Sequence, residues 1–181
     1  MIEGNRIVLR PIRLADREQT LSLRLDLEAN RSYMGYPYPI NEVSEERWIA
    51  GLYSEGTRTR IDLAIVDKKT GKVIGLIGVK ELDTLHQRAS FGILLKREYW
   101  RKGYAKDATI LFFRYLFDEI HLHRVYLYVL LSNERAIALY KEFGFKREGI
   151  LRKHYFQSGS FQDVLIMGLL RGEFENLHLN R

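Results

Sequence analysis

Residues 99–106 read Tyr-Trp-Arg-Lys-Gly-Tyr-Ala-Lys and separate two apolar segments of different periodicity. Residues 89–95 alternate as a strand does, and residues 105–120 repeat with the spacing of a helix. The stretch is therefore a basic, glycine-containing turn that joins a strand to a helix. The first turn of a helix has unpaired backbone N–H groups, and glycine lets a ligand approach closely, so this turn is a candidate phosphate site.

A plainer interpretation of this turn also stands. A glycine before a helix is often only a turn residue, and basic side chains are usually solvated. Arg97, Arg101, Lys102 and Lys106 surround Gly103 with positive charge under either interpretation. The rest of the chain has to decide between the two.

The composition indicates one globular domain over residues 1–181. Apolar residues make up 46% and charged residues 29% of the chain, an ordinary globular balance. No segment has the apolar pattern of a signal peptide or approaches the ~20 apolar residues of a membrane helix. The chain has no cysteine, which excludes disulfides and thiolate metal sites. We therefore expect a cytoplasmic protein, and the net charge of +6 favours an anionic ligand.

Apolar spacing and turn residues predict the remaining elements. In chain order these are a strand at 7–9, a helix over 14–27, a loop over 30–41, a helix from Ser44, strands at 62–66, 72–82 and 88–95, a helix over 104–119, a strand at 123–131, a helix over 134–143, and strands from Phe145 and over 161–170. This order predicts an α+β domain with helices on both faces of one mixed sheet.

A second informative stretch covers residues 133–145. Asn133 and Tyr140 are seven residues apart on the predicted helix, so they share one face at a separation of about 10 Å. Asparagine is a common helix cap and tyrosine a common core residue. Their plain interpretation is therefore a cap and a packed ring.

Together the two stretches resemble the GNAT superfamily of N-acetyltransferases. The resemblance rests on a strand followed by Tyr-Trp-Arg-Lys-Gly-Tyr-Ala, and later on Asn-x-x-Ala-Ile-x-Leu-Tyr-x-x-x-Gly-Phe. The segments at 6–12 and 163–170 are similar to the branch that holds ribosomal-protein alanine and spermidine acetyltransferases. The resemblance covers about residues 6–172, leaves a tail at 173–181, and implies a mostly antiparallel sheet of about seven strands. One departure is Trp100, where the family has Gln or Arg.

The resemblance implies acetyl-CoA as the acetyl donor, and it also implies which residues of this chain bind each part of the cofactor. Six residues of the turn would bind the pyrophosphate through their N–H groups: Arg101, Lys102, Gly103, Tyr104, Ala105 and Lys106. The preceding strand would splay from its neighbour and present the pantetheine arm with the backbone of Ile93, Leu94 and Leu95. Asn133 matches the family asparagine near the pantetheine, and Tyr140 matches the family tyrosine at the sulfur.

The implied reaction is direct attack of a primary amine on the thioester in a ternary complex, with no metal. Tyr140 would protonate the departing thiolate, and a strand N–H group, of Leu94 or Leu95, would stabilise the developing oxyanion. A cysteine acyl-enzyme is excluded because the chain has no cysteine. Three residues are candidates for the base, although each is more often a surface residue: Glu81, Asp83 and His86.

Residues 30–44 indicate the class of acceptor, because the resemblance implies that they form one wall of the acceptor cleft. Their body, Tyr-Met-Gly-Tyr-Pro-Tyr-Pro at 33–39, is aromatic and uncharged. Because a polyamine needs carboxylates nearby, this favours a protein N-terminus or a small amine, with spermidine as the alternative. A non-catalytic CoA-binding protein and an RNA- or ribosome-binding protein stay open as other classes, although no RNA-binding signature is present. Membrane contact is not expected, and a homodimer stays open.

Overall fold

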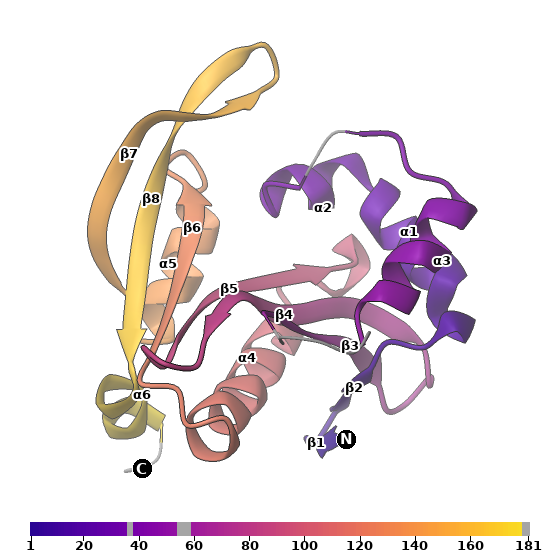
Figure 1. Ribbon diagram of the computed structural model, residues 1–181, viewed down its shortest axis with the longest axis horizontal. Helices are drawn as coiled ribbons and strands as arrows, with labels where there is room; N and C mark the ends of the chain where they lie inside the picture. The colour runs from indigo at the N-terminus through magenta and orange to yellow at the C-terminus, as the bar shows by residue number, and fades with distance from the viewer. Residues whose placement is uncertain (36–37, 54–58, 179–181) are drawn as a thin grey trace.

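One eight-stranded sheet organises the protein. The computed structural model describes residues 1–35, 38–53 and 59–178. The strands lie in the order β1-β2-β3-β4-β5-β6-β8-β7, and every neighbouring pair is antiparallel except the parallel pair β5 and β6 (Figure 1). The predicted α+β fold with a mixed, mostly antiparallel sheet is confirmed. The strand beyond the expected seven is β1, whose two residues are too few to show alternation.

The elements follow one another along the chain as β1 (Ile2–Glu3), β2 (Ile7–Pro11), η1 (Leu14–Asp16), α1 (Arg17–Leu25), α2 (Leu27–Ser32), α3 (Glu42–Gly51), β3 (Ile61–Asp67), β4 (Val73–Asp83), β5 (Arg88–Leu95), η2 (Arg97–Tyr99), α4 (Tyr104–Arg114), η3 (Tyr115–Glu119), β6 (Arg124–Leu130), α5 (Glu134–Glu142), β7 (Lys146–Gln157), β8 (Ser160–Leu170) and α6 (Arg171–His178). Across the described ranges, no helix is long and apolar enough to span a membrane.

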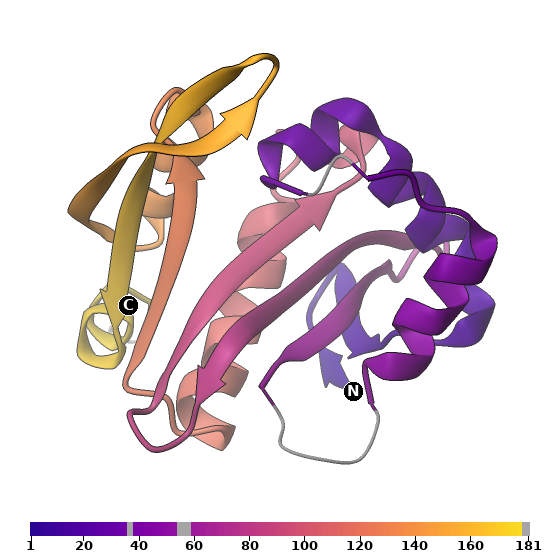
Figure 2. The same ribbon diagram turned by 45° about the horizontal axis from the view of Figure 1, so that its top comes forward.

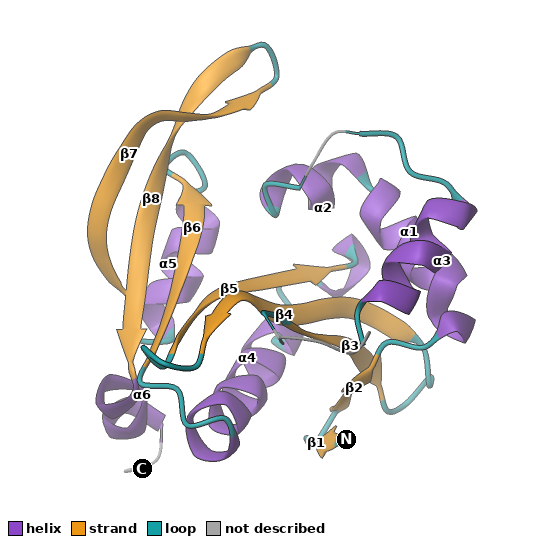
Figure 3. Ribbon diagram, in the orientation of Figure 1, coloured by secondary structure: helices purple, strands orange, loops and turns teal. Residues whose placement is uncertain are grey.

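Helices cover both faces of the sheet, as predicted. Helices α1, α2 and α3 lie on one side and α4 on the other (Figure 3). The larger core lies on the α4 face, where Phe91 of β5 meets Phe113 of α4 edge to face at 4.8 Å between ring centroids. A smaller core joins Ile49 of α3 to Ala64 and Val66 of β3. Removal of this apolar surface from water is the main force that fixes the layers.

The prediction of one helix over 14–27 is wrong. The segment divides into η1, α1 and α2, and Asp26 between the last two has an extended backbone, with φ −65° and ψ 106°. The Asp26 carboxylate accepts hydrogen bonds from the N–H groups of Glu28 and Ala29. Because an aspartate with these partners caps a new helix, α1 ends there and α2 runs into the predicted loop as far as Ser32.

Two further boundaries differ from prediction. The helix expected from Ser44 begins at Glu42, because Asn41 is the cap and exchanges hydrogen bonds with Ser44. The expected C-terminal tail is mostly helix α6, whose Phe174 is buried against the core. Residues 36–37 of the predicted acceptor loop and 179–181 of the tail lie outside the described residues.

The feature of the sheet that creates a site is the divergence of β5 and β6. Residues Arg88–Ser90 of β5 pair with residues Arg124–Tyr126 of β6, and these are the only described residues at which the two strands pair. Both segments lie near the start of their strands. Beyond that point β6 keeps pairing with β8, while residues 91–95 of β5 pair with β4 alone. Figure 2 shows the two strands opening away from each other toward their carboxyl ends. One edge of β5 is therefore left open to a ligand.

Candidate active site

The turn before α4 has the geometry of an anion site. Arg101 and Gly103 both have left-handed backbones, with φ of 59° and 82°. Within the described residues, no carbonyl or side chain accepts a hydrogen bond from the N–H groups of residues 101–106, whereas the N–H of Asp107 donates to the carbonyl of Gly103 at 3.1 Å. Unpaired N–H groups at a helix N-terminus carry partial positive charge. The six predicted turn residues thus form one surface that can bind a phosphate.

Arg6, which precedes β2, holds this turn in place. Its Nη1 donates to the carbonyl of Lys102 at 3.0 Å, and its Nε donates to Asp107 at 2.7 Å. Its guanidinium also lies 4.7 Å from the ring centroid of Tyr104. A Cβ at Gly103 would lie 2.8 Å from Arg6 Nη2, so glycine suits both the φ angle and the space. Because Arg6 lies about a hundred residues from the turn in the chain, local sequence patterns do not predict this role.

Trp100, the departure from the family pattern, packs into the protein. Its indole N–H donates to the carbonyl of Leu95 at 2.8 Å, and the Arg135 guanidinium lies 4.6 Å from the ring centroid. The side chain therefore joins the end of β5 to α5. The N–H groups of the turn remain open.

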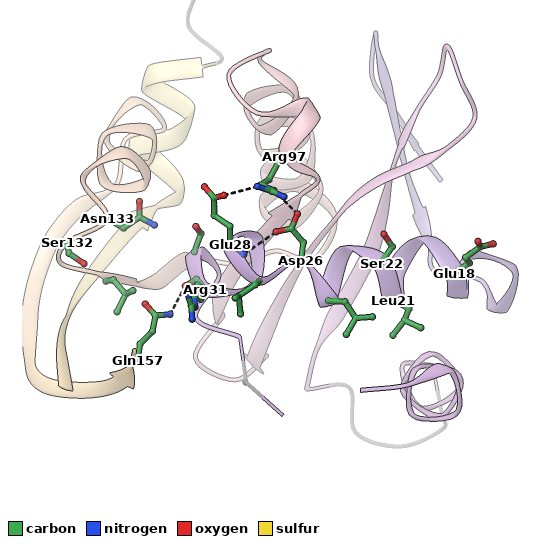
Figure 4. Close-up of a pocket in the computed structure, with 14 residues that line it drawn as sticks. Glu18, Leu21, Ser22, Asp26, Glu28, Arg31, Arg97, Ser132, Asn133 and Gln157 are labelled. Carbon is green, nitrogen blue, oxygen red and sulfur yellow. Dashed lines mark hydrogen bonds and ion pairs between the residues drawn. The ribbon is translucent and has the colours of Figure 1, made fainter. Parts of the chain in front are cut away.

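An open hollow of about 1030 Å³ lies at the mouth of the diverging strands. Residues after β6 line it on one side and helices α1 and α2 on the other (Figure 4). Of the predicted site residues, Asn133 lines it. Arg97, expected to add charge near the phosphate, instead pairs with Asp26 and Glu28 at 2.8 and 2.9 Å. These carboxylates compensate its charge, so that expectation is wrong.

Asn133 and Tyr140 have the packing that their plain interpretation predicts, and Asn133 also lines the hollow. The Asn133 carboxamide oxygen accepts from the N–H of Ala136 at 3.1 Å and caps α5. The Tyr140 ring contacts Phe91 and Phe145, with centroid distances of 6.4 and 5.8 Å. Burial, with a smaller contribution from Tyr33, raises the pKa of Tyr140. The phenol therefore keeps its proton at neutral pH and can serve as an acid.

A sequence model described as the acetyltransferase (GNAT) domain matches residues 6–146. The chain belongs to the GNAT acetyltransferase family. It is 31% identical over 155 residues to a spermidine N(1)-acetyltransferase of Vibrio cholerae, covering 83% of this chain and 87% of the relative. It is 32% identical to the uncharacterized N-acetyltransferase p20 of Bacillus licheniformis over 93% of this chain and 95% of p20.

A solved structure agrees with this assignment. The spermidine N-acetyltransferase of Vibrio cholerae in complex with CoA and spermine superposes with a TM-score of 0.87 at 26% identity, covering 94% of this chain and 99% of that one. The chain is therefore an acetyl-CoA-dependent N-acetyltransferase, as the resemblance implied. Among the described residues, no group of three His, Cys, Asp or Glu side chains could hold a metal ion.

The three candidate bases of this GNAT enzyme occupy different places. Glu81 accepts a hydrogen bond from the Tyr126 hydroxyl at 2.6 Å, from β4 across to β6 where the strands begin to diverge. Asp83 and His86 pair with each other at 2.8 Å in the turn before β5. At about 3.3 Å per residue, this turn lies roughly 17 Å from residue 93. Glu81 is four residues from Ile77, the partner of Ile93, or about 13 Å, and its bond to Tyr126 places it where β5 and β6 begin to diverge. Its place at the divergence and its shorter distance favour Glu81 over the other two.

The wall opposite α4 holds residues suited to the acceptor. The Tyr33 ring, which follows α2, covers Gly92 so closely that a Cβ there would lie 2.7 Å from it. Burial raises the pKa of Tyr33 to about 12. The β7–β8 hairpin approaches the same segment, where the Tyr155 hydroxyl donates to the carbonyl of Gly35 at 2.9 Å (Figure 1). The predicted wall at 30–44 thus contributes Tyr33. Tyr126 of β6 also lies on this face, and the alternation of side chains along the strand is the sequence signal that points to it.

Proposed function

We propose that this enzyme moves the acetyl group directly from acetyl-CoA to a primary amine while both substrates are bound, and that the amine belongs to a protein N-terminus or a small molecule. Three features support the proposal. These are the open N–H groups at 101–106, the edge of β5 that pairs with no β6 residue beyond Ser90, and the Tyr140 ring packed against Phe91, the first residue of that edge.

Each of these features suits a different part of acetyl-CoA. The turn suits the pyrophosphate, since its N–H groups and the helix dipole favour negative charge. Amides alternate in direction along a strand, and the N–H of Lys96 donates to the carbonyl of Ile74 on β4, so the amide of Leu94 also faces β4. Of the three predicted residues, Ile93 and Leu95 therefore offer their amides to the pantetheine arm at the open edge. The Asn133 side chain lines the mouth, and its oxygen is occupied in capping α5. Its NH₂ group is the part suited to a pantetheine carbonyl.

The chemistry follows from these positions. The amine nitrogen bonds to the thioester carbon, and negative charge develops on the carbonyl oxygen. Of the two predicted donors, Leu95 has its N–H on the open edge, where it stabilises that charge, whereas the N–H of Leu94 faces β4. The C–S bond then breaks, and Tyr140 gives its proton to the sulfur. Glu81 accepts the proton that the amine loses, through water, and Tyr140 recovers a proton from solvent.

A second acceptor class is favoured by the comparisons. Spermidine N(1)-acetyltransferases of Vibrio cholerae and Escherichia coli are among the relatives of this chain. The charge of the acceptor wall favours the first class, because residues 30–44 contain a single carboxylate, that of Glu42. A cytoplasmic location and a homodimer stay predictions.

The test is a thioester-consumption assay with acetyl-CoA and acceptors at equal concentration. The panel contains spermidine, an amino sugar, free amino acids, and peptides that begin with alanine or serine. The proposal predicts a higher kcat/KM for a peptide or a small amine than for spermidine. A higher value for spermidine would establish the second class and overturn the first.

A further inference from the structure

We infer that Lys80 selects an acceptor that carries an anionic group, such as a carboxylate, close to its amine, and that it disfavours polycations. This inference rests on the proposed function, because it assigns the acceptor side of the same site. Lys80 lies on β4 opposite Ser90 of β5, which in turn lies opposite Tyr126 of β6. These three positions cross the sheet at the point where β5 and β6 begin to diverge.

The Lys80 ammonium lies next to the proposed reaction centre. Its Nζ is 5.5 Å from the ring centroid of Tyr33. That ring covers Gly92, the residue before the edge at 93–95 that we assign to the pantetheine and thioester. Lys80 is also exposed, so its ammonium can meet a molecule that enters the cleft.

The other charges on this wall are already paired. Arg60 forms an ion pair with Asp62, in which Nη2 donates to Oδ1 at 2.9 Å. Arg24 pairs with the buried Glu45 at 2.5 Å. Within the described residues, no carboxylate forms an ion pair with Lys80. Of these three cations, Lys80 is therefore the one that no ion pair among the described residues neutralises, and the neighbouring Glu81 bonds to the Tyr126 hydroxyl instead.

The surroundings of Lys80 disfavour its charged form. Desolvation by its surroundings, followed by repulsion from Arg60, lowers the pKa of Lys80, and Arg24 adds to this repulsion. Asp62 and Glu81 oppose the change but do not cancel it. An anion bound beside Lys80 would remove this imbalance, whereas a second ammonium would increase it.

The neighbouring residue supplies the complementary group. Glu81 has a left-handed backbone, with φ 52°, at an irregularity in the pairing of β4 with β5. Its carboxylate turns toward the Tyr126 hydroxyl instead of pairing with Lys80. The site thus holds a cation and a carboxylate at adjacent positions, a pattern that matches an acceptor with an amine and an acidic group close together.

The test compares matched acceptors in wild type and variants. Each pair consists of an amino acid and its carboxamide, or of serine-initiated peptides with Glu or Lys at the second position. Spermidine is added as a polycation. Ratios of kcat/KM within a pair are compared between proteins, so the different reactivity of each amine cancels. The two kinds of pair also distinguish a free amino acid from an acidic peptide as the source of the anion.

Wild type should prefer the acidic member of at least one pair. Lys80→Gln should lower its kcat/KM by about tenfold, the loss expected of a charged hydrogen bond, and should change the neutral member little. It should also raise the kcat/KM for spermidine. Lys141→Gln, which removes an exposed lysine on α5 outside this wall, should change none of these ratios.

Several results would overturn the inference. An acid-to-neutral ratio that Lys80→Gln leaves unchanged would show that Lys80 only packs on Tyr33. A wild type that acetylates spermidine and no acidic acceptor would exclude the anionic class while leaving amine acetylation intact. If no amine is acetylated although CoA still raises the melting temperature, the proposed function fails and the inference fails with it. Equal melting temperatures of wild type and Lys80→Gln exclude misfolding as the cause of any change.

Discussion

Substitution of Gly103 by glutamate is the most direct perturbation of the proposed cofactor site. Gly103 has φ 82°, and a Cβ there would lie 2.8 Å from Arg6 Nη2. The left-handed backbone costs a non-glycine residue about 1–2 kcal/mol. The new carboxylate also lies where the open N–H groups of residues 101–106 would bind a phosphate. Gly103→Glu should therefore reduce stability modestly and CoA binding strongly.

The expected signal follows from ligand linkage. CoA at a hundred times its dissociation constant stabilises the folded state by about 2.7 kcal/mol. For a chain of this length each kcal/mol raises the melting temperature by about 2–4 °C, so wild type should gain roughly 5–11 °C. Gly103→Glu should lose most of that gain in a thermal melt with and without CoA.

Gly159 gives a matched control for this experiment. Its φ is 83°, nearly that of Gly103, but no atom lies within 4 Å of a Cβ built there. Gly159→Glu therefore has the same backbone cost and the same added charge at the β7–β8 turn, far along the chain from the cofactor turn. It should keep the full CoA-induced rise. Equal rises in both variants would refute the assignment of the turn at Gly103.

Three other predictions concern catalysis and folding. Tyr140→Phe keeps the ring against Phe91 and Phe145 but removes the hydroxyl, so kcat should fall by about 10²–10⁴ while the CoA-induced melting shift stays unchanged; a wild-type kcat would leave Tyr140 a packing residue. Glu81→Gln should lower kcat by about 10² and Asp83→Asn should not, because Asp83 pairs with His86 in the distant turn; equal losses would contradict the choice of base. Asp26→Ala removes the cap of α2 and one partner of Arg97, so the free energy of unfolding measured in urea should fall by about 0.5–2 kcal/mol; no change would show that the cap contributes nothing.

The local features of this protein could be predicted because they depend on neighbours in the chain. Alternation and helical spacing around residues 99–106 correctly predicted a turn between a strand and a helix. The pattern at residues 133–143 correctly predicted a helix with Asn133 as its cap, and the shared face of Asn133 and Tyr140 stays a prediction. Helix boundaries were predicted less accurately than the order of the elements. Asp26 divides a segment that is leucine-rich throughout, because its side chain satisfies N–H groups that a continuous helix would have paired within itself.

Long-range contacts were decided by the tertiary structure alone. The gap between β5 and β6 exists because β6 pairs with β8, a strand that comes more than thirty residues later in the chain. The same is true of Arg6 on the cofactor turn, Arg97 on α2, and Lys80 above Tyr33. Each contact joins residues whose separation in sequence exceeds any helical or strand period, so periodicity cannot predict it. The sequence by itself therefore determined the fold family, the turn at residues 99–106 and the candidate tyrosine. The tertiary structure decided that Glu81 lies on Tyr126 and Lys80 over Tyr33, because packing of whole elements sets these distances.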